Sequence, residues 1–356
     1  MSRVAVVFTG GTISMRHDAV AGGNVPALTG ADLLATVPEL GEIADVIAID
    51  HGLTPASHFR FPALFAIQRS VADALARDDV DGAVVVQGTD AIEETAFFFD
   101  LLHAGPKPVV VTGAMRSASQ PGYDGPRNLA DAVRVAASRD AAGAALGAVV
   151  VLDGSIEPAD DVTKTHASAF DTFRSLDVGS LGRVDDGLVR LDRERGPRRQ
   201  VDASRAAERV HLVIATVATD GTPIRALHAA GADGFVVAAT GAGNTDPSLL
   251  AAAEAAMADR LPVVLVTRCP AGAAGTGYAF PGGGATWQRA GALVAGHLTG
   301  PKARIALAIG LGAGLDRDGL AALLADPAPI HDPDRFWPAP AAATATSDPV
   351  ADRRTT

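Results

Sequence analysis

The chain has 356 residues, of which 48% are hydrophobic and 20% are charged, and its formal net charge is −11. This length fits one large α/β unit or two medium domains, and the composition excludes a disulfide-stabilised miniprotein or a largely disordered chain. The acidic excess repels phosphate backbones and anionic lipids, so we expect neither nucleic acid nor a membrane as a partner.

The N-terminus and the cysteine content indicate where the protein works. The chain passes directly into an apolar run at 4–8, without the hydrophobic region and cleavage site of a secretion signal. The longest apolar run, 305–315, is too short to cross a bilayer. Cys269 is the only cysteine, so no internal disulfide forms, and we expect a small buried side chain there rather than a reactive thiol. These features predict a soluble, cytoplasmic protein.

The first half of the sequence has the alternating pattern of a parallel α/β domain. Apolar, β-branched runs predict strands at 4–8, 46–49, 83–86, 108–112 and 148–152. Apolar residues at three- and four-residue steps predict helices at 61–76, 93–102 and 128–137. Because the strands are apolar on both faces, helices should cover both sides of the sheet. We therefore predict the α/β class, with a larger, doubly wound, parallel-type N-terminal domain over residues 1–190.

A charged stretch with Gly and Pro interrupts this pattern between residues 184 and 209, and we interpret 191–209 as an interdomain linker. Its arginines could form an anion patch, but we expect a solvated surface at Arg193, Arg195, Arg198 and Arg199. Further runs predict the strands of a smaller, Rossmann-like C-terminal domain over 210–330, at 210–215, 234–238, 263–267 and 303–308. Residues 331–356 are rich in proline and lack periodicity, which predicts a mobile tail.

Polar residues gather after the predicted strands, where parallel sheets hold their functional groups. The segments are TGGT at 9–12, QGTD at 87–90, TGAMR at 112–116 and DVTKT at 161–165. Each has a structural interpretation, with Gly10 and Gly11 in a tight turn, Asp90 as a helix cap and Lys164 as an exposed amine. Together they supply what a hydroxyl nucleophile needs for activation: a second hydroxyl, a cation and a carboxylate.

These segments also carry a resemblance to a known family. The sequence has no G-x-G-x-x-G, P-loop, G-x-S-x-G or H-E-x-x-H motif. The segments TGGTI at 9–13, QGTDAIEETA at 87–96, TGAMR at 112–116, DGPRNL at 124–129 and DVTKT at 161–165 stand in an order and spacing that resemble the bacterial-type L-asparaginase (asparaginase/glutaminase) family. The resemblance includes ATGAGNT at 239–245 and runs from residue 4 to about residue 324.

The resemblance implies a catalytic role for four residues. Thr12 stands at the position of the nucleophile, in a loop that closes over the substrate. Thr89, Asp90 and Lys164 match a second group that activates water or assists acyl transfer, and Asp90 would also bind the α-amino group of the substrate. Backbone N–H groups near Thr12 and Thr89 would hold the oxyanion. No metal or organic cofactor is implied.

The resemblance also implies four substrate-binding positions, Ser57, Gly88, Ala114 and Asn244. Ser57 would receive the α-carboxylate of the substrate. Asn244 would come from the neighbouring subunit, which implies a homodimer or homotetramer with shared active sites.

Three positions depart from the family pattern. The tyrosine of the closing loop has no counterpart, since Asn24-Val25-Pro26 occupies that region and the first tyrosine is Tyr123. Gln87 stands where many relatives have histidine. No acidic residue occurs at 269–288, where some relatives place a substrate-binding glutamate.

The sequence therefore predicts hydrolysis of L-asparagine to L-aspartate and ammonia, with L-glutamine as a possible second substrate. One alternative is an amidase that feeds ammonia to a tRNA-dependent amidotransferase, although the longer relative with that role has an additional N-terminal domain. Another is an amino-acid sensor with weakened catalysis, which the intact Thr12, Thr89, Asp90 and Lys164 set disfavours.

Overall fold

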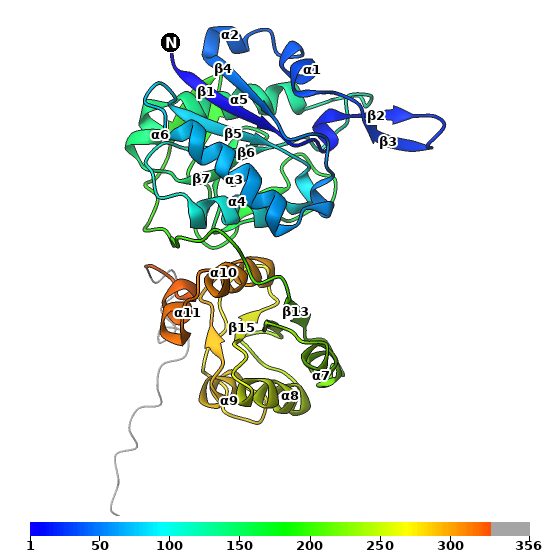
Figure 1. Cartoon of the computed structure of the whole chain (residues 1–356), viewed down its shortest axis with the longest axis vertical. Coiled ribbons are helices and arrows are strands. Elements are labelled where there is room, and N and C mark those ends of the chain that lie inside the picture. Colours follow the sequence, from blue (N-terminus) through cyan, green and yellow to red (C-terminus); the bar gives the residue numbers. More distant parts are fainter. Residues whose placement is uncertain (329–356) are drawn as a thin grey trace, which may run out of the picture.

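The structure, a computed structural model, describes residues 1–328 and contains a larger N-terminal and a smaller C-terminal α/β domain (Figure 1). The predicted fold class is confirmed by two sheets, one of eight strands and one of four. The tail predicted at 331–356 lies outside the described residues.

A mixed sheet forms the centre of the larger domain, in the order β12-β11-β8-β7-β6-β5-β1-β4. The five strands from β4 to β7 in this order are parallel. Strands β1, β5, β6 and β7 are almost entirely buried, as their apolar runs predict. The strand bounds are β1 (Arg3–Phe8), β4 (Asp45–Asp50), β5 (Gly82–Val86), β6 (Val109–Thr112), β7 (Ala148–Leu152), β8 (Ser155–Pro158), β11 (Gly182–Asp185) and β12 (Leu188–Leu191).

Three strands at one side of this sheet were not predicted, and they run antiparallel to their neighbours. Two-residue turns join β7 to β8 and β11 to β12. Both turns are Asp-Gly pairs with positive φ, 50° and 76° at Asp153-Gly154 and 47° and 76° at Asp186-Gly187. Such pairs suit the tight hairpin turn whose twist matches that of the strands. The parallel part of the sheet thus continues into an antiparallel extension.

Helices cover both faces of the larger sheet. One face packs against α3 (Phe61–Leu75) and α4 (Ile92–Leu102). The other face packs against α1 (Gly30–Ala35), α2 (Leu40–Ile43), α5 (Gly125–Ala137) and α6 (Arg139–Gly143). Side chains at alternate positions of β1 enter opposite cores, which explains why its residues had to be apolar throughout.

The smaller domain has a four-stranded parallel sheet in the order β13-β14-β15-β16. Its elements are β13 (Val210–Ile214), α7 (Thr222–Ala229), β14 (Gly234–Ala239), α8 (Pro247–Ala258), β15 (Val263–Thr267), α9 (Gly284–Ala290), β16 (Leu293–Val294), α10 (Gly300–Gly312) and α11 (Arg317–Leu324). The prediction that Cys269 is buried is wrong. Strand β15 ends two residues earlier, so Cys269 already lies outside the sheet and is exposed.

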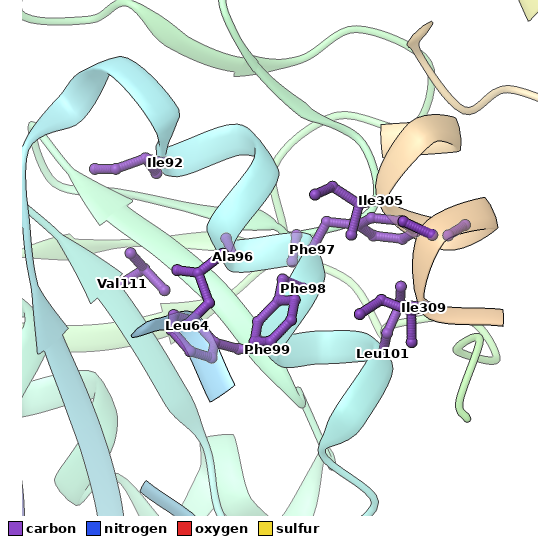
Figure 2. Close-up of a cluster of buried hydrophobic side chains, with 14 of the residues drawn as sticks. Leu64, Ile92, Ala96, Phe97, Phe98, Phe99, Leu101, Val111, Ile305 and Ile309 are labelled. Atoms are coloured by element: carbon purple, nitrogen blue, oxygen red, sulfur yellow. The ribbon is translucent and has the colours of Figure 1, made fainter. Parts of the chain in front are cut away.

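The strand predicted at 303–308 is also wrong, because this segment belongs to helix α10. Apart from Arg304, the residues of this segment are apolar, because α10 is enclosed between the smaller sheet and helix α4 of the larger domain. Ile305 and Ile309 of α10 lie beside Phe97 and Leu101 of α4 (Figure 2). A helix that is buried all round loses the amphipathic pattern that distinguishes it from a buried strand. This α4–α10 contact joins the cores of the two domains.

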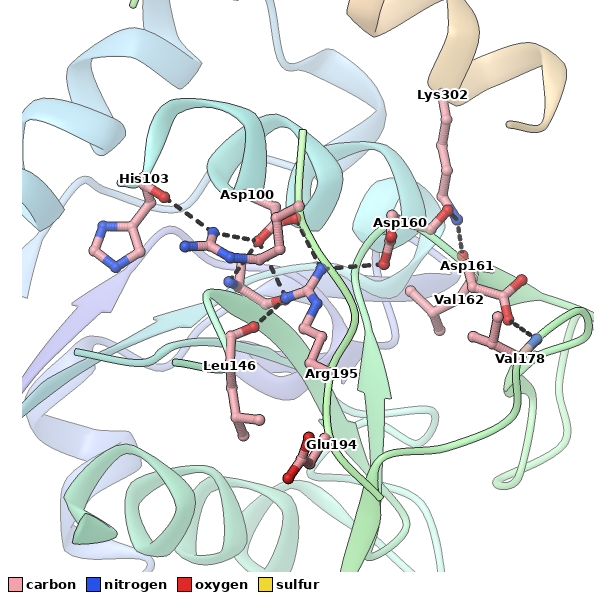
Figure 3. A network of polar contacts seen from close by, with 12 residues as sticks. Asp100, His103, Leu146, Asp160, Asp161, Val162, Val178, Glu194, Arg195 and Lys302 are labelled. Atoms are coloured by element: carbon pink, nitrogen blue, oxygen red, sulfur yellow. Dashed lines mark hydrogen bonds and ion pairs between the residues drawn. The ribbon is translucent and has the colours of Figure 1, made fainter. Parts of the chain in front are cut away.

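The segment between the domains, 192–209, has no helix or strand, but its arginines do not form the solvated surface that we predicted. The side chains of Arg195, Arg198 and Arg199 are only 3%, 9% and 2% exposed. Arg195 pairs with the buried carboxylate of Asp100, on α4 (Figure 3). Arg198 pairs with the same carboxylate. The acidic partner lies far away in the sequence, so the charge run alone did not reveal the burial. The linker is therefore fixed to the larger domain by ion pairs.

Candidate active site

Two glycine-rich segments meet at the ends of β1 and β5 and place the two predicted catalytic threonines in neighbouring segments. Gly11 has φ +95°, and a Cβ atom added there would lie only 2.1 Å from the backbone nitrogen of Gly88. Only glycine allows this approach and this backbone conformation. Thr12 and Thr89 directly follow these contacting glycines, at the start of the short helices η1 (Thr12–Ser14) and η3 (Thr89–Ala91).

The structure brings Thr89, Asp90 and Lys164 together. The Nζ atom of Lys164 donates to Oγ1 of Thr89 at 3.0 Å and to Oδ1 of Asp90 at 2.9 Å. Thr89 is buried, the Lys164 side chain is 14% exposed and that of Asp90 is 76% exposed. In the described part of the chain, Asp90 makes no capping bond and the Lys164 amine is paired, so the structural interpretations of these two residues are wrong. A hydroxyl that accepts a hydrogen bond from an ammonium is favoured in its deprotonated form.

Lys164 ends the strand β9 (Val162–Lys164), which pairs with β10 (Phe173–Ser175) and is held from two directions. The carboxylate of Glu93, on α4, accepts from the backbone N–H of Lys164 at 3.2 Å and from the hydroxyl of Thr163. The Nζ atom of Lys302, on α10, donates to the carbonyl oxygens of Asp160 and Val162 at 3.1 and 2.6 Å (Figure 3). Both domains therefore fix the strand that carries Lys164.

Thr12 differs from Thr89 in its hydrogen bonding. Its side chain is half-buried, and among residues 1–328 no group forms a hydrogen bond to its hydroxyl. The following chain forms a hairpin of β2 (Met15–Asp18) and β3 (Gly23–Pro26), which projects from the larger domain (Figure 1). The backbone N–H of His17 donates to Ser119 Oγ, and Ser117 Oγ donates to Asn24 Oδ1. The hairpin that follows Thr12 is thus attached to the loop after β6.

Three predicted substrate-binding residues lie around this group. Ser57 is exposed on the short helix η2 (Ala56–His58), which contacts η3. A Cβ atom added to Gly88 would lie 3.2 Å from the Ala56 side chain, so η2 packs against the glycine contact described above. Ala114 is buried in the loop after β6. A Cβ added at the preceding Gly113 would lie 3.1 Å from Cγ2 of Thr89. Ser57, Gly88 and Ala114 therefore adjoin the segment that bears Thr89.

Asn244 stands apart from this group in the smaller domain. It follows β14, and its backbone forms a bridge with Thr240. Within the described residues, its buried Oδ1 atom has no hydrogen-bond partner, and no hydrogen bond joins Asn244 to the larger domain. A role for Asn244 in a neighbouring subunit stays a prediction.

Residues that the sequence analysis did not single out support the site. Glu93 and Lys302 hold β9, while Asp124 accepts from the backbone N–H groups of Met115 and Arg116, both at 2.9 Å. Tyr123 donates from its hydroxyl to the carbonyl oxygen of Ile13 at 2.6 Å. Lys302 and Arg304 stand in the otherwise apolar segment 300–312, and this was a signal for Lys302, because a charge is rarely placed in such a segment without a partner. No comparable pattern marks Tyr123.

Burial sets the protonation of two groups near the site. It raises the pKa of Tyr123 to about 12, with a further contribution from the neighbouring charge of Asp124, so the phenol stays a proton donor at neutral pH. Burial also raises the pKa of Glu94, which follows Glu93 on α4. Among residues 1–328, no group of three or more His, Cys, Asp or Glu side chains is arranged to hold a metal ion.

Comparison with known proteins identifies the family. Residues 3–196 match the family described as "Asparaginase, N-terminal", and residues 209–324 match the "Glutaminase/Asparaginase C-terminal domain". The chain belongs to the asparaginase family. This confirms the resemblance drawn from the sequence segments, and the two matched regions correspond to the larger and the smaller domain.

Individual members of the asparaginase family match over most of the chain. A "Probable L-asparaginase" of Deinococcus radiodurans is 37% identical over 90% of this chain and 96% of its own length. An "L-asparaginase" of Bacillus licheniformis is 32% identical over 86% and 94% of the two chains. The crystal structure of a "Probable Cytoplasmic L-asparaginase" from Campylobacter jejuni has a TM-score of 0.81 and 27% identity, over 91% of this chain and 99% of that one. Within residues 1–328, no helix is both long and apolar enough to cross a membrane.

Proposed function

We propose that this protein hydrolyses the side-chain amide of L-asparagine to L-aspartate and ammonia by a threonine-based mechanism. The observation that carries the proposal is the ammonium of Lys164, which donates to both Thr89 and Asp90 at hydrogen-bond distance. The names of the relatives, which are asparaginases matched over most of the chain, support the choice of substrate.

The proposed reaction begins with attack of the Thr12 hydroxyl oxygen on the amide carbon. Backbone N–H groups at the contacting glycine segments stabilise the negative charge that forms on the carbonyl oxygen. The C–N bond then breaks, the proton from the hydroxyl leaves with the nitrogen as ammonia, and an ester to Thr12 remains. Water activated at Thr89 cleaves this ester and releases aspartate. Lys164 favours the deprotonated hydroxyl of Thr89, and Asp90 fixes the Lys164 ammonium.

The side chains that are exposed and can still form hydrogen bonds indicate how the substrate would be recognised. The Asp90 side chain is 76% exposed although one of its oxygens is bonded to Lys164, so its carboxylate has capacity to accept hydrogen bonds from the substrate's α-amino group. The hydroxyl of Ser57 is exposed on the neighbouring η2 and would donate to the α-carboxylate. The asparagine side chain would then lie between the segments that bear Thr12 and Thr89.

Ammonia release from L-asparagine by the purified protein tests the proposal. We expect turnover by the wild type and a loss of at least about 100-fold in kcat for Thr12→Ala and for Thr89→Ala. Thr36→Val is a matched control, because this exposed threonine caps α1 away from the site and should leave kcat unchanged. No turnover by the wild type between neutral and mildly alkaline pH would disprove the function. Full activity of either alanine variant would disprove the mechanism.

The same assay separates the remaining alternatives. A sensor would bind aspartate tightly without releasing ammonia, and an amidase that serves a transamidation partner would release ammonia efficiently only with that partner. Parallel rates with L-asparagine and L-glutamine give the substrate preference, for which one methylene group accounts for about 1–3 kcal/mol.

We also propose that the active site is shared between subunits through Asn244. Within residues 1–328 the Asn244 Oδ1 atom has no hydrogen-bond partner, and such an unsatisfied polar group calls for an explanation, which a shared site would supply. Light scattering across a range of concentrations gives the oligomeric state, and the specific activity is measured on the same samples. We expect activity only at concentrations where the protein is an oligomer. Asn244→Ala should assemble normally and raise KM for asparagine. A fully active monomer of 36.1 kDa would contradict the shared site.

A further inference from the structure

Tyr123 connects two segments of the site that lie far apart in the sequence. It directly precedes Asp124 and helix α5, and its hydroxyl donates to the backbone carbonyl oxygen of Ile13 at 2.6 Å. Ile13 is fully buried and is the residue that follows Thr12. The bond is thus made to the peptide unit that joins Ile13 to Ser14, one residue beyond the proposed nucleophile.

The local structure is shaped to hold this tyrosine. A Cβ atom added to Gly125 would lie 2.5 Å from the Tyr123 ring, so the glycine at the start of α5 leaves the space that the ring occupies. Its pKa of about 12 keeps the hydroxyl protonated, and a protonated phenol serves as a donor rather than as a general base at neutral pH.

The next residue ties the same turn to the other side of the site. The carboxylate of Asp124 accepts from Met115 and Arg116 N–H groups, and Nδ2 of Asn128 donates to both Asp124 and the carbonyl of Gly113. These bonds fix the loop that contains Ala114. The Tyr123-Asp124 pair therefore sets the distance between the Thr12 segment and the loop after β6.

We propose that Tyr123 is a positioning residue, whose hydroxyl holds the Ile13 carbonyl and thereby orients the Thr12 hydroxyl toward the Lys164-Thr89-Asp90 group. This inference rests on the proposed function. Among residues 1–328, the Thr12 side chain has no hydrogen bond of its own to fix it, so its orientation depends on the backbone at Ile13. The tyrosine acts through that backbone and does not touch the substrate.

Tyr123→Phe tests the proposal, because it keeps the ring and removes only the hydroxyl. We expect kcat to fall at least 10-fold, while KM and the dissociation constant for aspartate change less than twofold, since Ser57 and Asp90 are untouched. The shape of the pH profile should be retained, because the lost hydroxyl does not titrate in the working range. Thr36→Val is the control, since it also removes a hydroxyl bonded to a backbone carbonyl, that of Leu33 at 2.6 Å.

A second measurement follows the Thr12 segment without any turnover. Arg16 is exposed on β2, and trypsin should cleave after it at least threefold faster in Tyr123→Phe than in the wild type or Thr36→Val. A wild type that releases no ammonia would end the proposed function, whereas unchanged cleavage after Arg16 would end this inference on its own. A kcat within twofold of wild type would also overturn it. The inference would also be overturned if Tyr123→Phe had a lower melting temperature than Thr36→Val and this loss of folded protein accounted for the whole fall in kcat.

Discussion

Two charged pairs, one within the larger domain and one between this domain and the linker, are built from similar groups but differ in their exposure to water. Lys164 and Asp90 pair at 2.9 Å with side chains 14% and 76% exposed. Arg195 and Asp100 pair at 2.8 Å with side chains 3% and 2% exposed. The first pair faces the proposed substrate, and the second attaches the linker to helix α4.

The difference in exposure determines whether each carboxylate can still bind a ligand. Asp100 accepts from Arg195, Arg198 and the backbone N–H of Ala148, so its hydrogen-bonding capacity is used within the protein. A buried carboxylate needs such bonds, because removal from water costs several kcal/mol per ion. Asp90 has one bonded oxygen and an exposed side chain, so it can accept a ligand. We therefore expect loss of the Lys164-Asp90 pair to lower kcat, and loss of the Arg195-Asp100 pair to lower the free energy of unfolding.

The largest effect is expected for Lys164→Met, which keeps the length of the side chain and removes its charge. Thr89 then loses its ammonium donor, and kcat for asparagine should fall about 1,000-fold or more. The free energy of unfolding should change by no more than about 1 kcal/mol, because the partner Asp90 is largely exposed. Ammonia release and urea unfolding measure the two quantities.

Lys107→Met provides a control for this change. The Nζ atom of Lys107 donates to the carbonyls of Leu75 and Arg77 in the same domain, away from the site. Its loss should leave kcat unchanged. A Lys164→Met protein with near-normal kcat would show that the Lys164-Thr89-Asp90 group has no catalytic role.

The second effect is expected for Asp100→Asn, which preserves size but leaves the buried guanidinium of Arg198 without its anion and that of Arg195 with Asp160 alone. The free energy of unfolding should fall by about 3–5 kcal/mol, as is typical when one partner of a buried ion pair is removed. The kcat of the folded protein at 25 °C should stay within a few fold of wild type. Asp192→Asn breaks the exposed pair with Arg183 and should cost at most about 1 kcal/mol. Equal losses in both variants would contradict the contrast between buried and exposed pairs.

The sequence predicted the central strands and helices of the fold because the spacing of their apolar residues follows from which faces are buried. The runs at 4–8 and 83–86 are apolar throughout, and both form interior strands of the sheet, with β1 between β5 and β4 and β5 between β6 and β1. The antiparallel extension was missed because its strands are short and partly polar, although Asp153-Gly154 and Asp186-Gly187 were hairpin signals. Helix α10 was taken for a strand because a fully enclosed element carries no periodic pattern of either kind.

The sequence predicted the grouping at the site through residues that follow parallel strands, and Thr89 and Asp90 follow β5 in this way. Lys164 reaches them by a different route, since the antiparallel β8 intervenes between β7 and its own strand β9. Arg195 was interpreted as surface because its partner Asp100 is 95 positions away. Pairing over such distances depends on the tertiary structure, and a run of charges looks the same whether it is solvated or paired.

The smallest effect is expected for Lys302, which tests a buried charge without a charged partner. Lys302 is buried like Arg195 but, within residues 1–328, forms no ion pair. Its Nζ atom donates to the carbonyls of Asp160 and Val162, and burial lowers its pKa from 10.5 to about 8 despite the nearby charges of Glu93 and Asp160. Between these two values the unfolded chain binds a proton that the folded chain has released, so stability from this group rises with pH.

The unfavourable burial of the Lys302 charge should therefore be fully present below about pH 8 and should disappear toward pH 10.5. A shift of this size corresponds to about 3 kcal/mol. Lys302→Met lacks the titrating group, so the unfolding free energy of the wild type should increase relative to this variant as the pH rises from 7 to 10. Urea unfolding of both proteins at each pH isolates this difference from the other lysines and tyrosines. A constant difference would show that Lys302 keeps its proton when buried, and its bonds to the strand that carries Lys164 would then be those of a permanent ammonium.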